Sequence, residues 1–74
     1  MKLPVVSGEQ TVKALAKAGF IAVRQKGSHV RLEKETLDGI IKLTVPIHET
    51  LKKRTLHIIL KEAGLSVEEF VELL

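Results

Sequence analysis

The residues best suited to chemistry lie in one short stretch, Arg24-Gln25-Lys26-Gly27-Ser28-His29-Val30-Arg31. It combines three cations, a glycine suited to a turn, a hydroxyl and one imidazole. Histidine has an unperturbed pKa of about 6.5, so it can take or give a proton near neutral pH. Neighbouring cations would attract a phosphate and stabilise charge that builds on it. RNA carries its own nucleophile, the 2′-hydroxyl, so this set of side chains favours RNA cleavage.

A β-hairpin is predicted to present these side chains. The first strand should span residues 20–25, which are rich in β-favouring residues. Lys26-Gly27 should form the turn, of type I with the glycine in the left-handed region, because lysine resists positive φ. The second strand, residues 28–33, alternates apolar and polar side chains. The period of two puts His29 and Arg31 on its polar face, so the histidine should be exposed.

The rest of the sheet and the helix before it are predicted from local signals. Ser7-x-x-Gln10 is a capping-box pattern, and the helix that it opens should span residues 8–18, with Gly19 as the stop. Asp38-Gly39 is a strong turn signal. A third strand should therefore come next, over residues 40–45, completing an antiparallel meander.

Two further helices are predicted after a basic loop, residues 47–54. Thr55 should cap the first of them, whose apolar residues repeat at helical spacing up to a stop at Gly64. Ser66-x-x-Glu69 is a second capping box and should open a short helix that runs to Leu74.

The predicted order is α-β-β-β-α with a short C-terminal helix, all in one domain, residues 1–74. This is a two-layer α+β architecture with a three-stranded antiparallel sheet and helices on one face. The double-stranded-RNA-binding fold has the same order, but order alone is weak evidence of function. Cysteine is absent, and no apolar run approaches the length needed to span a bilayer. We therefore expect a cytoplasmic protein without a membrane partner.

Charge is distributed unevenly along the chain. Residues 1–61 hold all twelve lysines and arginines against five acids, a net charge of +7, and residues 62–74 hold four acids and no base. This pattern indicates either a polyanionic partner or an ordinary solvated surface. The only aromatics are two phenylalanines in apolar patterns, so base stacking should not dominate binding. The candidate RNA contacts are Lys26, Ser28, Arg31, Lys52, Lys53 and Arg54.

The two other histidines have less specific interpretations. His48 follows Pro46 and could either hold the loop through a hydrogen bond or take part in RNA handling as an auxiliary group. His57 lies beside the apolar stripe of the second predicted helix and is expected at the surface. No histidine pair has the compact spacing of a zinc site, so no metal or other cofactor is expected.

Taken together, these motifs resemble those of one known family. They are Val6-Ser7-Gly8, Ala18-Gly19-Phe20, the stretch Arg24 to His29, Thr44-Val45-Pro46-x-His48, and Lys52-Lys53-x-Thr55-Leu56-x-x-Ile59-Leu60-Lys61-x-Ala63-Gly64-Leu65. In this order and in a chain of this length, the sequence resembles the HicA-type toxins, small mRNA interferases of toxin–antitoxin pairs. It departs from them at Arg54, where these proteins often carry glycine.

The resemblance implies a double-stranded-RNA-binding-like fold that acts as a ribonuclease. The histidine of the Gly-Ser-His motif, here His29, would be the catalytic residue, and a HicB-type antitoxin would mask it. The resulting hypothesis is a metal-independent endoribonuclease acting on mRNA, in which water, Lys26 or His48 completes the proton transfer. The alternative is a non-catalytic RNA-binding module that uses the same basic hairpin and loop.

Overall fold

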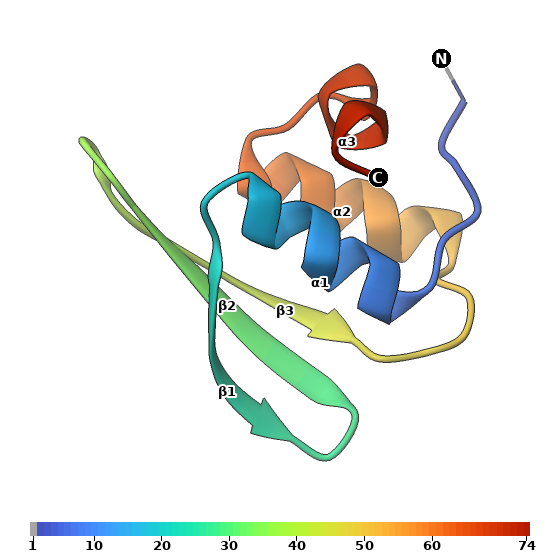
Figure 1. Ribbon diagram of the computed structural model, residues 1–74, viewed down its shortest axis with the longest axis horizontal. Coiled ribbons are helices and arrows are strands. Elements are labelled where there is room, and N and C mark those ends of the chain that lie inside the picture. The colour runs from blue at the N-terminus through green and yellow to red at the C-terminus, as the bar shows by residue number, and fades with distance from the viewer. Residues whose placement is uncertain (1) are drawn as a thin grey trace.

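The computed structural model describes residues 2–74 and contains one sheet and three helices in the predicted order (Figure 1). The sheet is antiparallel, with strand order β1-β2-β3. All three helices lie on the same side of it, so the predicted two-layer α+β architecture is confirmed. The covered face of the sheet is the one that faces the helices, and the open face is the other. The elements are α1 (Gly8–Lys17), β1 (Ile21–Lys26), β2 (His29–Thr36), β3 (Gly39–Pro46), α2 (Lys53–Ala63) and α3 (Val67–Leu73).

Both predicted capping boxes are present. Ser7 caps α1 and Ser66 caps α3, each exchanging hydrogen bonds with the residue three positions on. The backbone and side-chain hydrogen bonds from Ser66 lower the pKa of Glu69, because they favour its charged form. Gly19 follows α1 at a φ of +101°, which a glycine adopts at little cost, so its predicted role as the stop is also confirmed.

The predicted start of the second long helix was wrong. Thr55 lies inside α2, whose N-cap is Lys52, and no side chain caps this helix end. Lys53 and Arg54, predicted in a loop, therefore lie in the first helical turn. The buried side chain of Leu51, just before the cap, fixes where the chain enters the helix. This tertiary contact replaces the side-chain cap that the sequence pattern suggested.

Both hairpin turns lie one position away from their predicted places. Lys26 pairs with His29, so the two loop residues are Gly27 and Ser28 instead of Lys26 and Gly27. Gly27 has a φ of +59°, as predicted, but it occupies the first loop position while Ser28 keeps a negative φ. That combination is typical of a type II′ turn, whose twist suits a hairpin better than the predicted type I. The second hairpin likewise closes through Leu37 and Asp38, and Gly39 begins β3.

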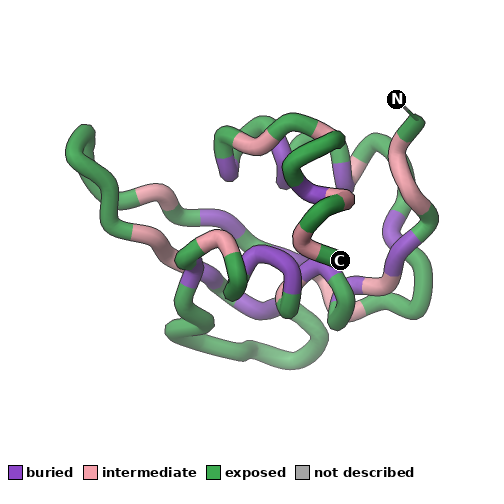
Figure 2. Tube along the Cα trace, turned by 45° about the horizontal axis from the view of Figure 1, so that its top comes forward, coloured by how far each residue is buried: buried purple, intermediate pink, exposed green. Residues whose placement is uncertain are grey.

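The core lies between the covered face and the helices, where Figure 2 shows the buried segments gathered. α2 packs on β3, and α3, whose Phe70 is fully buried, packs on α1. The β2–β3 hairpin extends beyond the helices and is exposed at its tip (Figures 1 and 2). None of the helices in residues 2–74 combines the length and apolar character that a membrane crossing requires. The buried hydrophobic residues are Val6, Ala14, Leu15, Phe20, Val30, Leu32, Leu43, Val45, Leu51, Leu56, Ile59, Leu60, Ala63 and Phe70.

Candidate nucleic-acid interface and active site

The alternation of β2 decides which side chains reach the open face. Val30 and Leu32 are buried on the covered face, whereas His29 and Arg31 are exposed. β3 repeats this pattern, with Leu43 buried and Thr44 exposed beside Arg31. The predicted exposure of His29 is therefore confirmed.

A bulge in β1 brings two more cations to the same face. Ala22 pairs with Leu32 and Arg24 pairs with Arg31, so Val23 is an extra residue on the β1 side. If Val23 instead paired regularly with Arg31, Arg24 would lie opposite Val30, a covered-face residue of β2. The bulge moves Arg24 to the open face beside Arg31, and Lys26 follows it to lie opposite His29.

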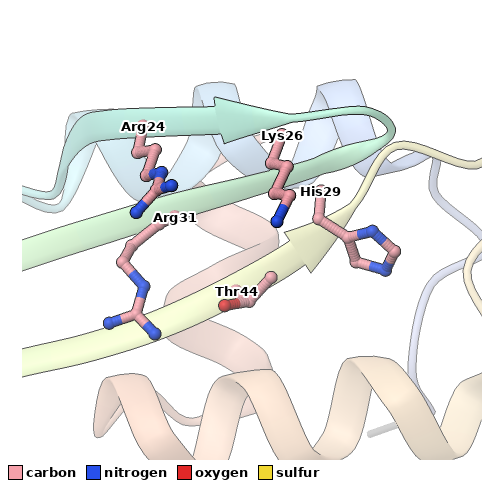
Figure 3. A pocket seen from close by; sticks show the side chains of 5 residues that line it. All are labelled: Arg24, Lys26, His29, Arg31 and Thr44. Carbon is pink, nitrogen blue, oxygen red and sulfur yellow. The ribbon is translucent and has the colours of Figure 1, made fainter.

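These side chains surround a shallow pocket of about 220 Å³, the basic pocket, lined by Arg24, Lys26, His29, Arg31 and Thr44. Figure 3 shows them projecting from three adjacent strands on one side of the sheet. Arg24 and Lys26 reach from β1 across β2, and the His29 imidazole stands at the end of the group, turned away from the guanidinium groups (Figure 3). No carboxylate is among the described residues that line this pocket. Its positive charge is therefore uncompensated within the pocket, which favours an anionic ligand.

Backbone hydrogen bonds tie the His29 turn to the rest of the fold. The Ile47 N–H donates to the Ser28 carbonyl at 2.6 Å, and the Gly8 N–H donates to the His48 carbonyl at 2.9 Å. A Cβ on Gly8 would overlap the Pro46 carbonyl oxygen, so only glycine allows α1 to approach this strand end so closely. Three of the sequence motifs thus meet at one end of the sheet.

The predicted site residues fall into separate groups. The structure brings Lys26, His29 and Arg31 together in the basic pocket, and it places Ser28 in the adjacent turn. The three cations at 52–54 are exposed at the start of α2, outside the residues that line the pocket.

Neither of the other histidines lines the basic pocket. His48 is exposed after β3 and lines a different hollow with Ser7, Glu9, Ile47 and Glu49. The hydrogen bond that holds its loop is made by its backbone carbonyl. His57 is exposed on α2, as expected. Residues 2–74 contain no cluster of three or more histidine or acidic side chains that could hold a metal ion.

Sequence reasoning missed two residues of the pocket, Arg24 and Thr44. Arg24 belongs to the basic stretch, but its face depends on the bulge at Val23, which the sequence pattern does not reveal. Thr44 belongs to the motif before Pro46, and its polar position between buried Leu43 and Val45 was the available signal.

The chain matches the model of a known protein family. A family model described as "HicA toxin of bacterial toxin-antitoxin" matches residues 8–65. The matched segment contains the whole sheet, α1 and α2, and it ends before α3. No curated protein matches the chain.

Proposed function

Because the chain belongs to the HicA toxin family of toxin–antitoxin systems, we propose that it is a metal-independent endoribonuclease that cleaves mRNA and thereby stops translation and growth. Toxins of this family are mRNA interferases, which is what the resemblance implies for this chain. The observation that carries the proposal is the exposed His29 imidazole in a pocket whose other lining groups are three cations and one hydroxyl. Since its substrate would be mRNA, the protein would act in the cytoplasm.

The proposed reaction is transesterification within the RNA strand. A base removes the 2′-hydroxyl proton, the 2′ oxygen forms a bond to the adjacent phosphorus, and the bond from phosphorus to the 5′ oxygen breaks. An acid gives a proton to that leaving oxygen. His29 acts as the base or the acid, a contribution that is typically about 10²–10⁴-fold in rate. Lys26, which lies directly opposite His29, stabilises the charge that accumulates on the phosphate oxygens.

The geometry of the pocket also bears on the second proton carrier. Lys26 lies directly opposite His29, whereas His48 lines another hollow. Water or Lys26 therefore fits the second role better than His48 does. One observation favours the rival function, a non-catalytic RNA-binding module. The reaction needs both a base and an acid, and His29 is the only imidazole among the described residues that line the pocket.

The decisive experiment is cleavage of labelled single-stranded RNA in the presence of EDTA, comparing the wild type with His29→Ala. We expect the wild type to cleave and the variant to be at least 10²-fold slower, because the proton carrier is missing. The variant should fold normally, since His29 is exposed. His57→Ala, which removes an exposed histidine from α2, is the matched control and should cleave normally.

Two results would contradict the proposal. If folded His29→Ala cuts RNA at the wild-type rate, His29 is not the catalytic residue. If the wild type binds RNA without cutting it, the rival binding function stands.

The proposed regulator is a HicB-type antitoxin that covers the open face. Next to the basic pocket, this face carries the apolar side chains Ile21, Val23 and Ile40, which are 67%, 49% and 54% exposed. Together with Gly19, Glu33 and Glu35, they line a second hollow. Exposed apolar groups gathered in this way are typical of interaction surfaces. An antitoxin with acidic groups over the basic pocket and apolar groups over this hollow would shield His29 and bury both regions at once.

A further inference from the structure

The open face contains a pair of like charges that the fold holds directly opposite one another. Arg24 and Arg31 are cross-strand partners in β1 and β2, and both are exposed. Like charges in this position are destabilising. The next open-face residue along β2 is an acid, Glu33, but it lies opposite Lys42 of β3. Neither guanidinium group therefore has an acid directly opposite it on a neighbouring strand, and an anion bound between the two would relieve their repulsion.

The pocket residues form two successive rows across the sheet. Arg24, Arg31 and Thr44 form the arginine row, and Lys26, His29 and Pro46 form the histidine row. The rows are two residues apart along each strand, which corresponds to about 6.6–6.8 Å. This spacing is of the same order as the distance between neighbouring phosphates along an RNA strand. A single strand of RNA that runs parallel to the β-strands could thus place one phosphate over each row.

The two rows differ in what their side chains can do. Guanidinium groups remain charged at all relevant pH values and present planar pairs of donors that match two phosphate oxygens. They bind phosphate well, but they do not act as a general acid or base, because they do not lose their protons. The histidine row contains the only imidazole among the described residues of the pocket. A phosphate that is to be cleaved belongs beside the imidazole, and a phosphate that is only to be held belongs beside the arginines.

We propose that the arginine row is a separate phosphate-binding subsite, in which Arg24 and Arg31, assisted by the Thr44 hydroxyl, hold the phosphate next to the one that is cleaved. Arg24 is accordingly a positioning residue, which fixes the register of the RNA relative to His29. The assignment of the cleaved phosphate to the histidine row rests on the proposed function, but binding of a phosphate by the arginine row does not. The bulge at Val23 is the feature of the backbone that creates the subsite.

The test compares substrates that differ only in the number of their phosphates. A dinucleotide with a single phosphodiester is compared with the same dinucleotide carrying a terminal phosphate on its 5′ or its 3′ side. In the wild type, the terminal phosphate on one of the two sides should raise kcat/KM by about tenfold or more, the usual worth of hydrogen bonds to a charged group. Arg24→Gln should remove this advantage while the dinucleotide without the terminal phosphate is still cleaved.

Matched controls separate the subsite from general charge and from folding. Lys13→Gln removes one exposed positive charge from α1 and should keep the full advantage. Arg24→Lys keeps the charge but loses the planar pair of donors, and should recover only part of it. Thermal unfolding of each variant, measured in parallel, should show a folded protein, because these side chains are exposed.

A binding measurement keeps the proposal testable even if the protein does not cleave RNA. The 2′-deoxy forms of the same oligonucleotides lack the nucleophile, and their affinities can be measured by NMR titration. A terminal phosphate should tighten binding to the wild type and not to Arg24→Gln. Equal gains in both proteins, or no gain in the wild type, would overturn the subsite. Failure of cleavage together with a gain that depends on Arg24 would overturn the proposed function alone.

Discussion

The two faces of the sheet differ in burial, although the same two strands, β2 and β3, supply side chains to both. On β2, Val30 and Leu32 are 7% and 0% exposed toward the helices, whereas their neighbours His29 and Arg31 stand open to solvent. Adjacent residues of this strand therefore belong alternately to the core and to the proposed site. The core contributes stability through the burial of apolar surface. The open face contributes little to it and contains a repulsive pair, Arg24 and Arg31.

The difference in burial between the two faces explains how a chain of 74 residues can have both a core and a charged surface. A domain of this size buries a smaller fraction of its surface than a large one does, so it cannot give up core positions. Strand alternation solves the problem, because every second residue is free to carry charge without loss of packing. Substitutions on the covered face should therefore change stability, and substitutions on the open face should change binding or cleavage.

The largest effect on stability is expected on the covered face. Leu32→Ala should lower the free energy of unfolding by about 2–5 kcal/mol, because it leaves a cavity beneath the helices. The adjacent open-face variant Arg31→Ala should stay within about 0.5 kcal/mol of the wild type. Urea denaturation of the three proteins measures both. Equal losses for the two variants would mean that the faces do not divide stability from function as we describe.

A second prediction divides the open face itself. If the antitoxin covers the apolar hollow as well as the basic pocket, Ile21→Ala should weaken the complex by about 1–3 kcal/mol, within the range of interface anchor residues. Cleavage by the free toxin should remain unchanged, since Ile21 does not line the basic pocket. Binding can be measured by calorimetry with the purified antitoxin. Leu37→Ala, at the exposed tip of the β2–β3 hairpin, is a control for loss of an exposed apolar side chain outside the hollow.

A structure of the toxin–antitoxin complex would test whether the antitoxin covers His29. His29 should lose its solvent exposure, with acidic antitoxin side chains near Lys26 or Arg31. A complex in which His29 stays fully open would rule out direct masking and leave inhibition through a change of conformation.

The sequence predicted the arrangement wherever local patterns decide it. The alternation from Ser28 to Glu33 placed His29 and Arg31 on one face, and both capping boxes identified their helices. These features depend on residues two to four positions apart, which is the range that periodicity and capping report. The motifs of the HicA family likewise lie along the chain and can be recognised without coordinates.

Both hairpin turns were misplaced by one position, and two further errors arose where contacts between distant residues decide the geometry. The bulge at Val23 is a property of how β1 pairs with β2, and nothing in the composition of residues 20–25 marks it. The bulge puts Arg24 on the open face, where it pairs with Arg31. The start of α2 depends on the burial of Leu51 in the core, which overrode the capping preference of Thr55. Both errors involve tertiary structure that a local pattern does not contain.

The smallest expected effect concerns the cations at the start of α2. Lys53 and Arg54 occupy the first turn of this helix, which contains no acid, and Lys52 is its N-cap. The partial positive charge of a helix N-terminus repels cations, at a cost of about 0.3–1 kcal/mol for each at low ionic strength. Replacing all three residues with alanine should therefore stabilise the protein slightly, even though alanine is no better an N-cap than lysine. Thermal unfolding at low salt measures this gain, which should shrink as salt is added.

The same triple variant tests whether this region belongs to the RNA-binding surface. If the three cations contact phosphates, RNA affinity should fall for all sequences, and the slope of log K against log salt should flatten by about one unit for each lost contact. Stability and affinity would then move in opposite directions, which is expected of charges kept for binding at a cost to the helix. An affinity and salt slope equal to those of the wild type would instead show that RNA binding does not use the start of α2, leaving the open face as the proposed interface.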